Sequence, residues 1–196
     1  MVARRIAPLA ALVAAFLWML GVFLSGQSIA FFATAAGYFW LGVADAAFGL
    51  LIVPVVISTA RDRPLQLVGL LIAVGMVVTG AFLSLDALGF LGQNPPLWVV
   101  NSADAPFVAL FAWIAVTSYL GRRSRDLGST VFALGLLSAI AVPASIVSLS
   151  GDAPTGVAGL VDGLLALVVL ASTPAWFIAV SIHLWRARIS TSQAHA

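Results

Sequence analysis

The chain has 196 residues, of which 62% are hydrophobic and only 8% are charged, with a net charge of +2 at neutral pH. Soluble domains carry roughly 25% charged and about 45–50% apolar residues, so a soluble fold of this size could not bury so much apolar surface. The composition therefore predicts an all-α integral membrane protein. The few basic residues lie in short clusters between apolar runs, a distribution that excludes a continuous surface for nucleic acid.

The residue inventory excludes several kinds of chemistry. The chain has no Lys and no Cys, which excludes a Schiff base, a disulfide and a thiolate metal ligand. A haem held by two His is excluded as well, because only His183 lies near an apolar run. Motifs for an activated serine, a zinc hydrolase or a phosphate-binding glycine loop are missing. We therefore expect no cofactor, no metal and no enzymatic activity.

Six apolar runs are each long enough to cross a bilayer as a helix, which takes about 20 residues. In chain order they are Ile6–Leu24, Tyr38–Ala60, Leu65–Leu85, Ala105–Leu120, Ser129–Leu149 and Val157–Trp185. The sixth is long enough for a tilted span, and we expect Pro174 to kink it. The sequence thus predicts a six-transmembrane-helix bundle.

The first apolar run has an alternative interpretation as a signal peptide, because two Arg precede it and Ser28-Ile29-Ala30 resembles a cleavage site. Its length of about 19 residues exceeds the roughly 7–15 apolar residues of a signal sequence. We therefore expect a retained helix.

The Arg residues predict the orientation of the spans. They lie before the first span, between the second and third, between the fourth and fifth, and after the sixth: Arg4, Arg5, Arg61, Arg63, Arg122, Arg123, Arg125, Arg186 and Arg188. The positive-inside rule assigns all these positions to the cytoplasm. We expect a multi-pass protein of the cell (cytoplasmic) membrane, a bacterial inner membrane, with both termini and a short tail over residues 189–196 in the cytoplasm.

Sliding the chain against itself by 59 residues produces its clearest internal similarity. Gly21–Ser25 then falls on Gly80–Ser84, and Ala44–Phe48 falls on Ala103–Phe107. Both matches occupy the same place in a helical hairpin, which favours a duplication. Chance alignment of apolar sequence is the alternative.

A fainter third copy is marked by Asp162, which lies 58 residues beyond Asp104. We therefore expect one transmembrane domain over residues 1–196, built from three hairpins at approximately residues 6–63, 64–125 and 126–188. Hairpins in parallel repeat would be related by an axis along the membrane normal.

Three carboxylates near the outer ends of the even spans form the candidate polar site: Asp45, Asp104 and Asp162. An ionisable group inside a span is costly and marks a functional hypothesis, here cation binding or proton relay. The alternative is that each carboxylate caps the N-terminus of its helix. We favour capping for Asp104 and Asp162, whereas both interpretations stay open for Asp45, which lies about seven residues, or about 10 Å, inside its span.

Pairs of small residues at a spacing of four predict close helix packing: Gly42 with Ala46, and Gly159 with Gly163. Three functions stay open. The favoured one is a non-enzymatic accessory subunit or small-molecule-binding bundle, followed by a channel or ion- or proton-coupled transporter that uses the Asp residues. A membrane enzyme acting on lipid or quinone is the least favoured. The expected partner is the lipid bilayer, and both a membrane-protein partner and a homo-oligomer stay open.

Overall fold

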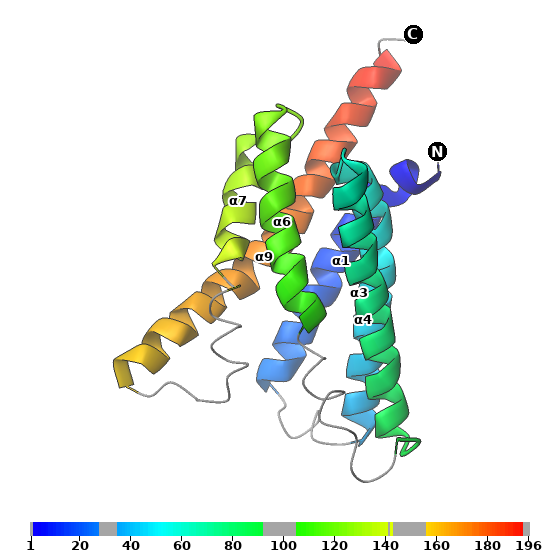
Figure 1. Cartoon of the computed structure of the whole chain (residues 1–196), viewed down its shortest axis with the longest axis vertical. Helices are drawn as coiled ribbons and strands as arrows, with labels where there is room; N and C mark the ends of the chain where they lie inside the picture. The colour runs from blue at the N-terminus through cyan, green and yellow to red at the C-terminus, as the bar shows by residue number, and fades with distance from the viewer. Residues whose placement is uncertain (1, 28–34, 92–104, 141, 143–155, 194–196) are drawn as a thin grey trace.

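The structure, a computed structural model, describes residues 2–27, 35–91, 105–140, 142 and 156–193. Within these ranges the chain is all-helical. The helices, shown in Figure 1, are α1 (Val2–Gln27), α3 (Ala35–Thr59), α4 (Arg63–Ala87), α6 (Ala105–Arg123), α7 (Ser129–Ala139) and α9 (Gly156–Gln193).

Four of the described helices are long and apolar enough to cross a membrane. The spanning segments are Val2–Leu20, Phe39–Thr59, Arg63–Ala87 and Ala105–Arg123. The predictions of an all-helical chain and of transmembrane helices are confirmed for this part of the molecule. The fifth predicted run is helical from Ser129 to Ala139, and most of its remainder lies outside the described residues. In the sixth, α9 continues through Pro174 and past Trp185 to Gln193, over 38 residues.

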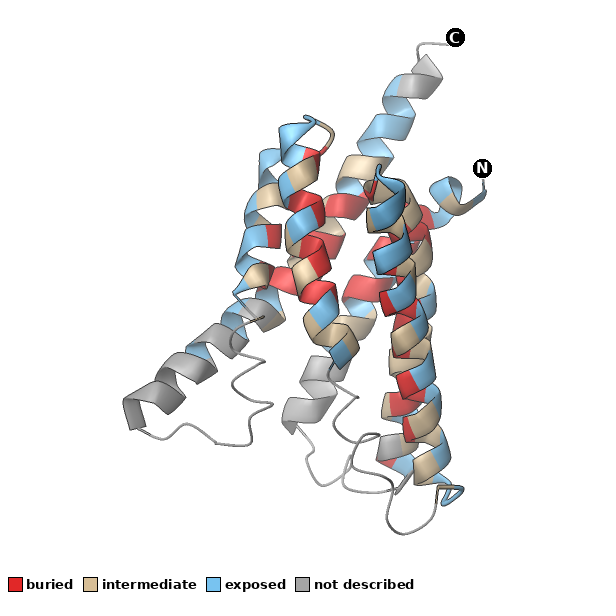
Figure 2. Ribbon diagram, in the orientation of Figure 1, coloured by how far each residue is buried: buried red, intermediate tan, exposed pale blue. Residues whose placement is uncertain are grey.

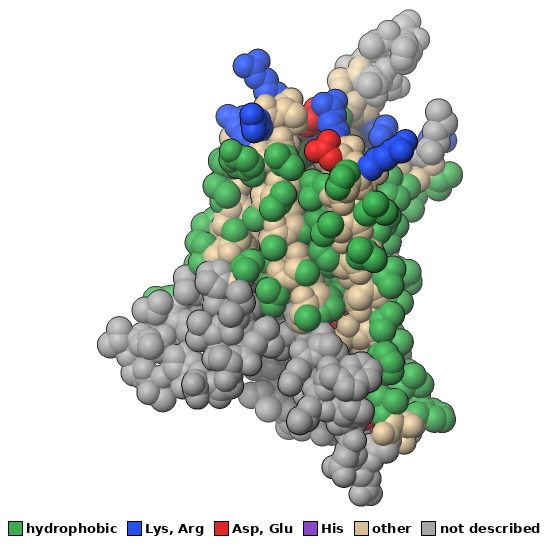
Figure 3. Space-filling view, viewed as in Figure 1, with side chains coloured by type: hydrophobic (Ala, Val, Ile, Leu, Met, Phe, Trp, Pro, Cys, Tyr) green, Lys and Arg blue, Asp and Glu red, His purple; other side chains and the backbone are tan. Residues whose placement is uncertain are grey.

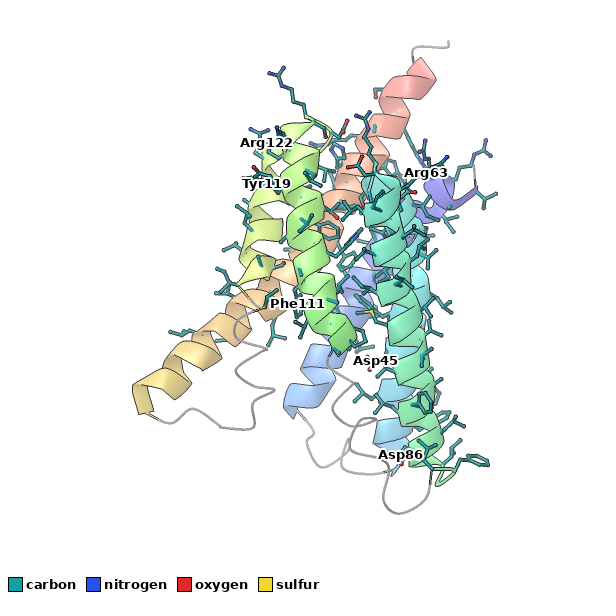
Figure 4. The ribbon with its side chains drawn as sticks, viewed as in Figure 1. Asp45, Arg63, Asp86, Phe111, Tyr119 and Arg122 are labelled. Atoms are coloured by element: carbon teal, nitrogen blue, oxygen red, sulfur yellow. The ribbon has the colours of Figure 1, made fainter. Side chains whose placement is uncertain are left out.

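The helices pack in the order of the chain, since each contacts the helix before it and the helix after it, and α9 also packs against α1. They run alternately in opposite directions, so both termini and the α3–α4 and α6–α7 turns lie at one end of the bundle (Figure 1). Arg63 and Arg122 lie at this end, which we call the arginine end, and Asp45 and Asp86 lie towards the other (Figure 4). In the space-filling view the Arg side chains gather above a belt of hydrophobic side chains (Figure 3).

The outer sides of the helices are apolar, and their buried residues face one another (Figure 2). Leu50 is 63% exposed, Leu71 70% and Leu164 64%. Soluble monomers rarely expose continuous apolar surface on this scale. Lipid is the solvent that such a surface requires.

Aromatic side chains from four helices fill the interior. Trp176 and Phe177 of α9 are fully buried. Trp176 meets Trp113 of α6 with ring centroids 6.3 Å apart, and Phe177 meets Phe48 of α3 at 5.6 Å. Phe48 then contacts Trp18 of α1 at 5.7 Å. Since each such pair contributes about 0.5–1.5 kcal/mol beyond its buried area, the connected rings stabilise α1, α3, α6 and α9 as one unit.

Helices α3 and α4 approach most closely at two glycines. A Cβ added to Gly80 would collide with the backbone carbonyl of Gly42 and lie 2.5 Å from the backbone nitrogen of Ala46. A Cβ added to Gly42 would lie 2.5 Å from the hydroxyl oxygen of Ser84. Helices in lipid associate through small residues that allow such contact. The structure thus places Gly42 and Ala46, the first predicted packing pair, against α4.

We expect Gly80→Ala to lower the free energy of unfolding by about 1–3 kcal/mol, because the new methyl group meets backbone that cannot move aside. Gly75→Ala is the matched control in the same helix, since its Cβ would meet only Pro106, at 3.4 Å. The control should be neutral or gain up to about 1 kcal/mol from helix propensity. The measurement is the thermal unfolding midpoint in mild detergent, and equal midpoints for the two variants would contradict the close approach.

Candidate functional site

A cavity of about 520 Å³ lies at the arginine end, where parts of the chain distant in sequence converge. It is lined by the start of α1, the end of α3 and its turn, the start of α4, the α6–α7 turn and the later part of α9. Its volume falls within the roughly 300–1,000 Å³ typical of ligand pockets. We call it the arginine cavity. The polar residues that line it are Arg4, Arg5, Ser58, Thr59, Arg61, Gln66, Asp126, His183 and Arg188.

Pro8 in α1 determines how one wall of the cavity is held. A proline has no N–H, so the carbonyl four residues earlier, that of Arg4, loses its partner within the helix. Nη2 of Arg188 donates a hydrogen bond to this carbonyl oxygen at 2.7 Å. Deeper in the bundle, the buried Ser181 hydroxyl donates to the carbonyl oxygen of Pro8 at 2.7 Å. These two bonds fix α9 along α1.

The short turn between α3 and α4 carries Arg61 to the cavity. Helix α4 begins after Asp62 with Pro64 in its first turn, where the missing proline N–H costs nothing. Nε2 of Gln66 donates to the carbonyl oxygen of Ala60 at 2.6 Å. This bond ties the start of α4 to the end of α3, so the backbone at Arg61 is held from both sides.

The α6–α7 turn brings an acidic group to the same place. The Asp126 N–H donates to the carbonyl of Gly121 at 2.9 Å, and the Arg125 N–H donates to that of Arg122 at 3.2 Å. This is the Schellman pattern that ends many helices, with Arg125 in the left-handed region at φ 62°. Asp126 then pairs with Arg61 at 3.0 Å between carboxylate and guanidinium.

The lining of the arginine cavity has an excess of positive charge. Four Arg side chains line it, against the single carboxylate of Asp126. Ser58 also belongs to the lining, but its hydroxyl oxygen is buried and has no hydrogen-bond partner in the described part of the chain. The cavity thus gathers guanidinium groups from separate parts of the chain, which is the chemistry of an anion-binding site.

No protein-family model, curated protein or solved structure matches the chain. A functional assignment therefore rests on the geometry of this site and on the residues that form it.

Of the three carboxylates in the predicted polar site, the structure describes only that of Asp45. Asp45 is half-buried in α3, on the part of the bundle away from the arginine end (Figure 4). Asp104 and the side chain of Asp162 lie outside the described residues, so the convergence of the three stays a prediction. The second predicted packing pair, Gly159 and Gly163, lies in α9, and its close packing against another helix also stays a prediction. Among the residues that the structure describes, no group of three His or Asp side chains is placed to hold a metal ion.

Hydroxyl and indole groups form a set of interhelical hydrogen bonds that the sequence analysis does not predict. Nε1 of Trp176 donates to the hydroxyl of Ser118 at 2.8 Å, and Ser138 and Ser172 share a bond of 3.3 Å. Nε1 of Trp113 donates to a backbone carbonyl of α4 at 2.9 Å. All of these partners join different helices. In lipid such bonds contribute about 0.6–2 kcal/mol each to helix association.

A second cavity, of about 670 Å³, lies between α4 and α6 and has a different character. Its lining is almost wholly apolar, with Gly75, Ala109 and Ala112 among its residues. This groove offers contact to lipid chains, whereas the arginine cavity offers specific hydrogen-bond donors.

The arginine cavity is also absent from the sequence predictions, in which the Arg clusters report only membrane orientation. Arg residues from the beginning and the end of the chain line one cavity because α9 packs against α1. One local signal is present in the sequence: Pro8 stands four residues after Arg4 and frees its carbonyl for a donor from elsewhere.

The Arg61–Asp126 pair is exposed by 76% and 33% at its two side chains. We therefore expect a coupling free energy of only about 0.2–1 kcal/mol. A double-mutant cycle with Arg61→Gln and Asp126→Asn measures it from unfolding midpoints. The coupling should shrink as salt concentration rises, because salt screens exposed charges. A coupling well above this range, or one insensitive to salt, would show that the pair is not an easily opened contact.

Proposed function

We propose that the chain is a non-enzymatic, multi-pass membrane protein that binds a small molecule, either alone or as an accessory subunit of a larger membrane complex. The observation that carries this proposal is the arginine cavity, where Arg and Gln residues from separate helices surround about 520 Å³. Pockets with a few convergent polar groups are the usual form of a small-molecule site.

The proposal includes six membrane spans, with the arginine end and both termini in the cytoplasm and the chain in a bacterial inner membrane. Its support is that both termini and both turns that carry Arg lie at one end of the bundle (Figures 1 and 3). Basic residues favour the cytoplasmic side of a membrane. The arginine cavity would then open towards the cytoplasm.

We also propose that the bundle consists of three hairpins related by duplication, over residues 6–63, 64–125 and 126–188. The sequence similarity pairs Phe48 with Phe107, and both rings pack on Trp18, at 5.7 Å and 5.8 Å between centroids. Arg63 and Arg122, also paired by the similarity, lie at the same end (Figure 4). The paired Phe residues share one neighbour and the paired Arg residues lie at one end of the bundle, which supports a common origin of the first two hairpins.

The binding proposal is tested with a variant that fills the cavity. Ala187 is an exposed residue of α9 that lines the arginine cavity, so Ala187→Trp should occupy the space without disturbing the core. Ala133→Trp, at an exposed position of α7 outside the cavity, is the matched control. Native mass spectrometry of the purified protein should detect a bound molecule in the parent chain and in the control, and a loss of it in Ala187→Trp. The proposal fails if the parent chain retains no molecule, or if Ala187→Trp retains it equally.

A transporter is the second candidate function, favoured by one observation: Asp45 is a half-buried carboxylate within the apolar segment Phe39–Thr59. Ionisable groups at such positions mark ion or proton pathways. In proteoliposomes, Asp45→Asn should abolish any proton or sodium flux, whereas Asp86→Asn, near the end of α4, should leave it unchanged. Equal flux through the parent chain and Asp45→Asn would remove that carboxylate from the mechanism.

A further inference from the structure

We infer that the arginine cavity binds the phosphate group of an anionic phospholipid from the leaflet at the arginine end of the bundle. This inference rests on the proposed function, because it names the class of molecule that the cavity receives. It follows from the charge of the cavity, from the way its donors are held, and from its position relative to the apolar belt.

The charge of the lining selects an anion. Arg4, Arg5, Arg61 and Arg188 contribute four guanidinium groups against one carboxylate. A guanidinium group matches the geometry of two phosphate oxygens and binds them through paired, charge-assisted hydrogen bonds. Asp126 accepts a hydrogen bond from the Ser124 hydroxyl and pairs with the rim residue Arg61 in an exposed ion pair. An incoming phosphate can replace its contact with Arg61.

One donor is held in place before any ligand arrives. Arg188 is positioned by its bond to the Arg4 carbonyl, which Pro8 leaves without a helical partner. The same bond joins α9 to α1, so the two helices that contribute Arg4, Arg5 and Arg188 to the lining are linked at the cavity.

The position of the cavity favours a lipid over a soluble phosphate compound. Its lining includes the apolar side chains of Ile57, Leu127 and Leu184 beside the Arg groups. The neighbouring outer side of α9 exposes Ile182 and Trp185, and Trp is favoured at membrane interfaces. The Arg side chains stand where the hydrophobic belt of the bundle ends (Figure 3). A headgroup at the guanidinium groups could therefore leave its acyl chains along the apolar surface.

The test uses the full chain in nanodiscs of phosphatidylcholine with or without phosphatidylglycerol. The readouts are the thermal unfolding midpoint and phosphatidylglycerol retention in native mass spectrometry. Phosphatidylglycerol should raise the midpoint of the parent chain. Arg4→Gln and Arg188→Gln should each weaken its binding about tenfold, which is the effect of losing about 1.4 kcal/mol. Arg123→Gln removes the same charge from the same end, outside the cavity, and should change binding less than about twofold.

An equal loss of lipid binding in Arg123→Gln and the cavity variants would overturn the inference in favour of general electrostatic attraction between the Arg side chains and the anionic lipid surface.

Inorganic phosphate is added to the phosphatidylcholine nanodiscs in a separate experiment. If it stabilises the chain as phosphatidylglycerol does, and the cavity variants abolish the effect, the ligand is a soluble phosphate compound and the lipid assignment falls. If the cavity variants bind phosphatidylglycerol normally while Ala187→Trp still displaces another molecule, the inference fails and the proposed function stands. If Ala187→Trp displaces nothing, both fail.

Discussion

Inside a bilayer every buried donor and acceptor must find its partner within the protein, because lipid offers none. This constraint explains how α9 is held. Its buried Trp176 donates to Ser118 of α6, its Ser181 donates to the Pro8 carbonyl, and its Arg188 donates to the carbonyl that Pro8 leaves free. The aromatic core and the wall of the arginine cavity are therefore two parts of one arrangement. A proline near the start of α1 supplies acceptors, and the last helix of the chain supplies the donors.

Four buried side-chain groups in the described part of the chain have no hydrogen-bond partner. Thr117, Thr173 and the indole nitrogen of Trp18 are buried without hydrogen-bond partners in the described part of the chain, and they lie within the packed interior. They line none of the cavities described above, so they carry no argument for a ligand. Ser58 belongs to the lining of the arginine cavity, but its hydroxyl oxygen is buried like the others and carries no argument for a ligand either. The exposed guanidinium groups are what distinguish the arginine cavity from an imperfectly packed core.

Hydropathy was sufficient to predict the helices but not the site. The apolar runs predict α1, α3, α4 and α6 because burial in lipid requires about 20 apolar residues for each span. They do not predict the extension of α9 from Arg186 to Gln193, because this segment is polar and lies beyond the apolar run. The arginine cavity depends on which helices become neighbours, and no local pattern encodes the contact between α1 and α9. The carboxylate site of Asp45, Asp104 and Asp162 stays a prediction, because two of its side chains lie outside the described residues.

The central claim is that both Arg-bearing turns and the arginine cavity face one side of the membrane, the cytoplasm. Single-cysteine labelling tests it directly, because the chain has no Cys of its own. Ser124→Cys lies in the α6–α7 turn and Ser190→Cys near the end of α9, at the arginine end, whereas Phe90→Cys follows α4 at the opposite end. A membrane-impermeant maleimide should label Phe90→Cys in intact spheroplasts and the other two only after the membrane is opened. Labelling of Ser124→Cys or Ser190→Cys from outside, or of all three from the same side, would contradict the account.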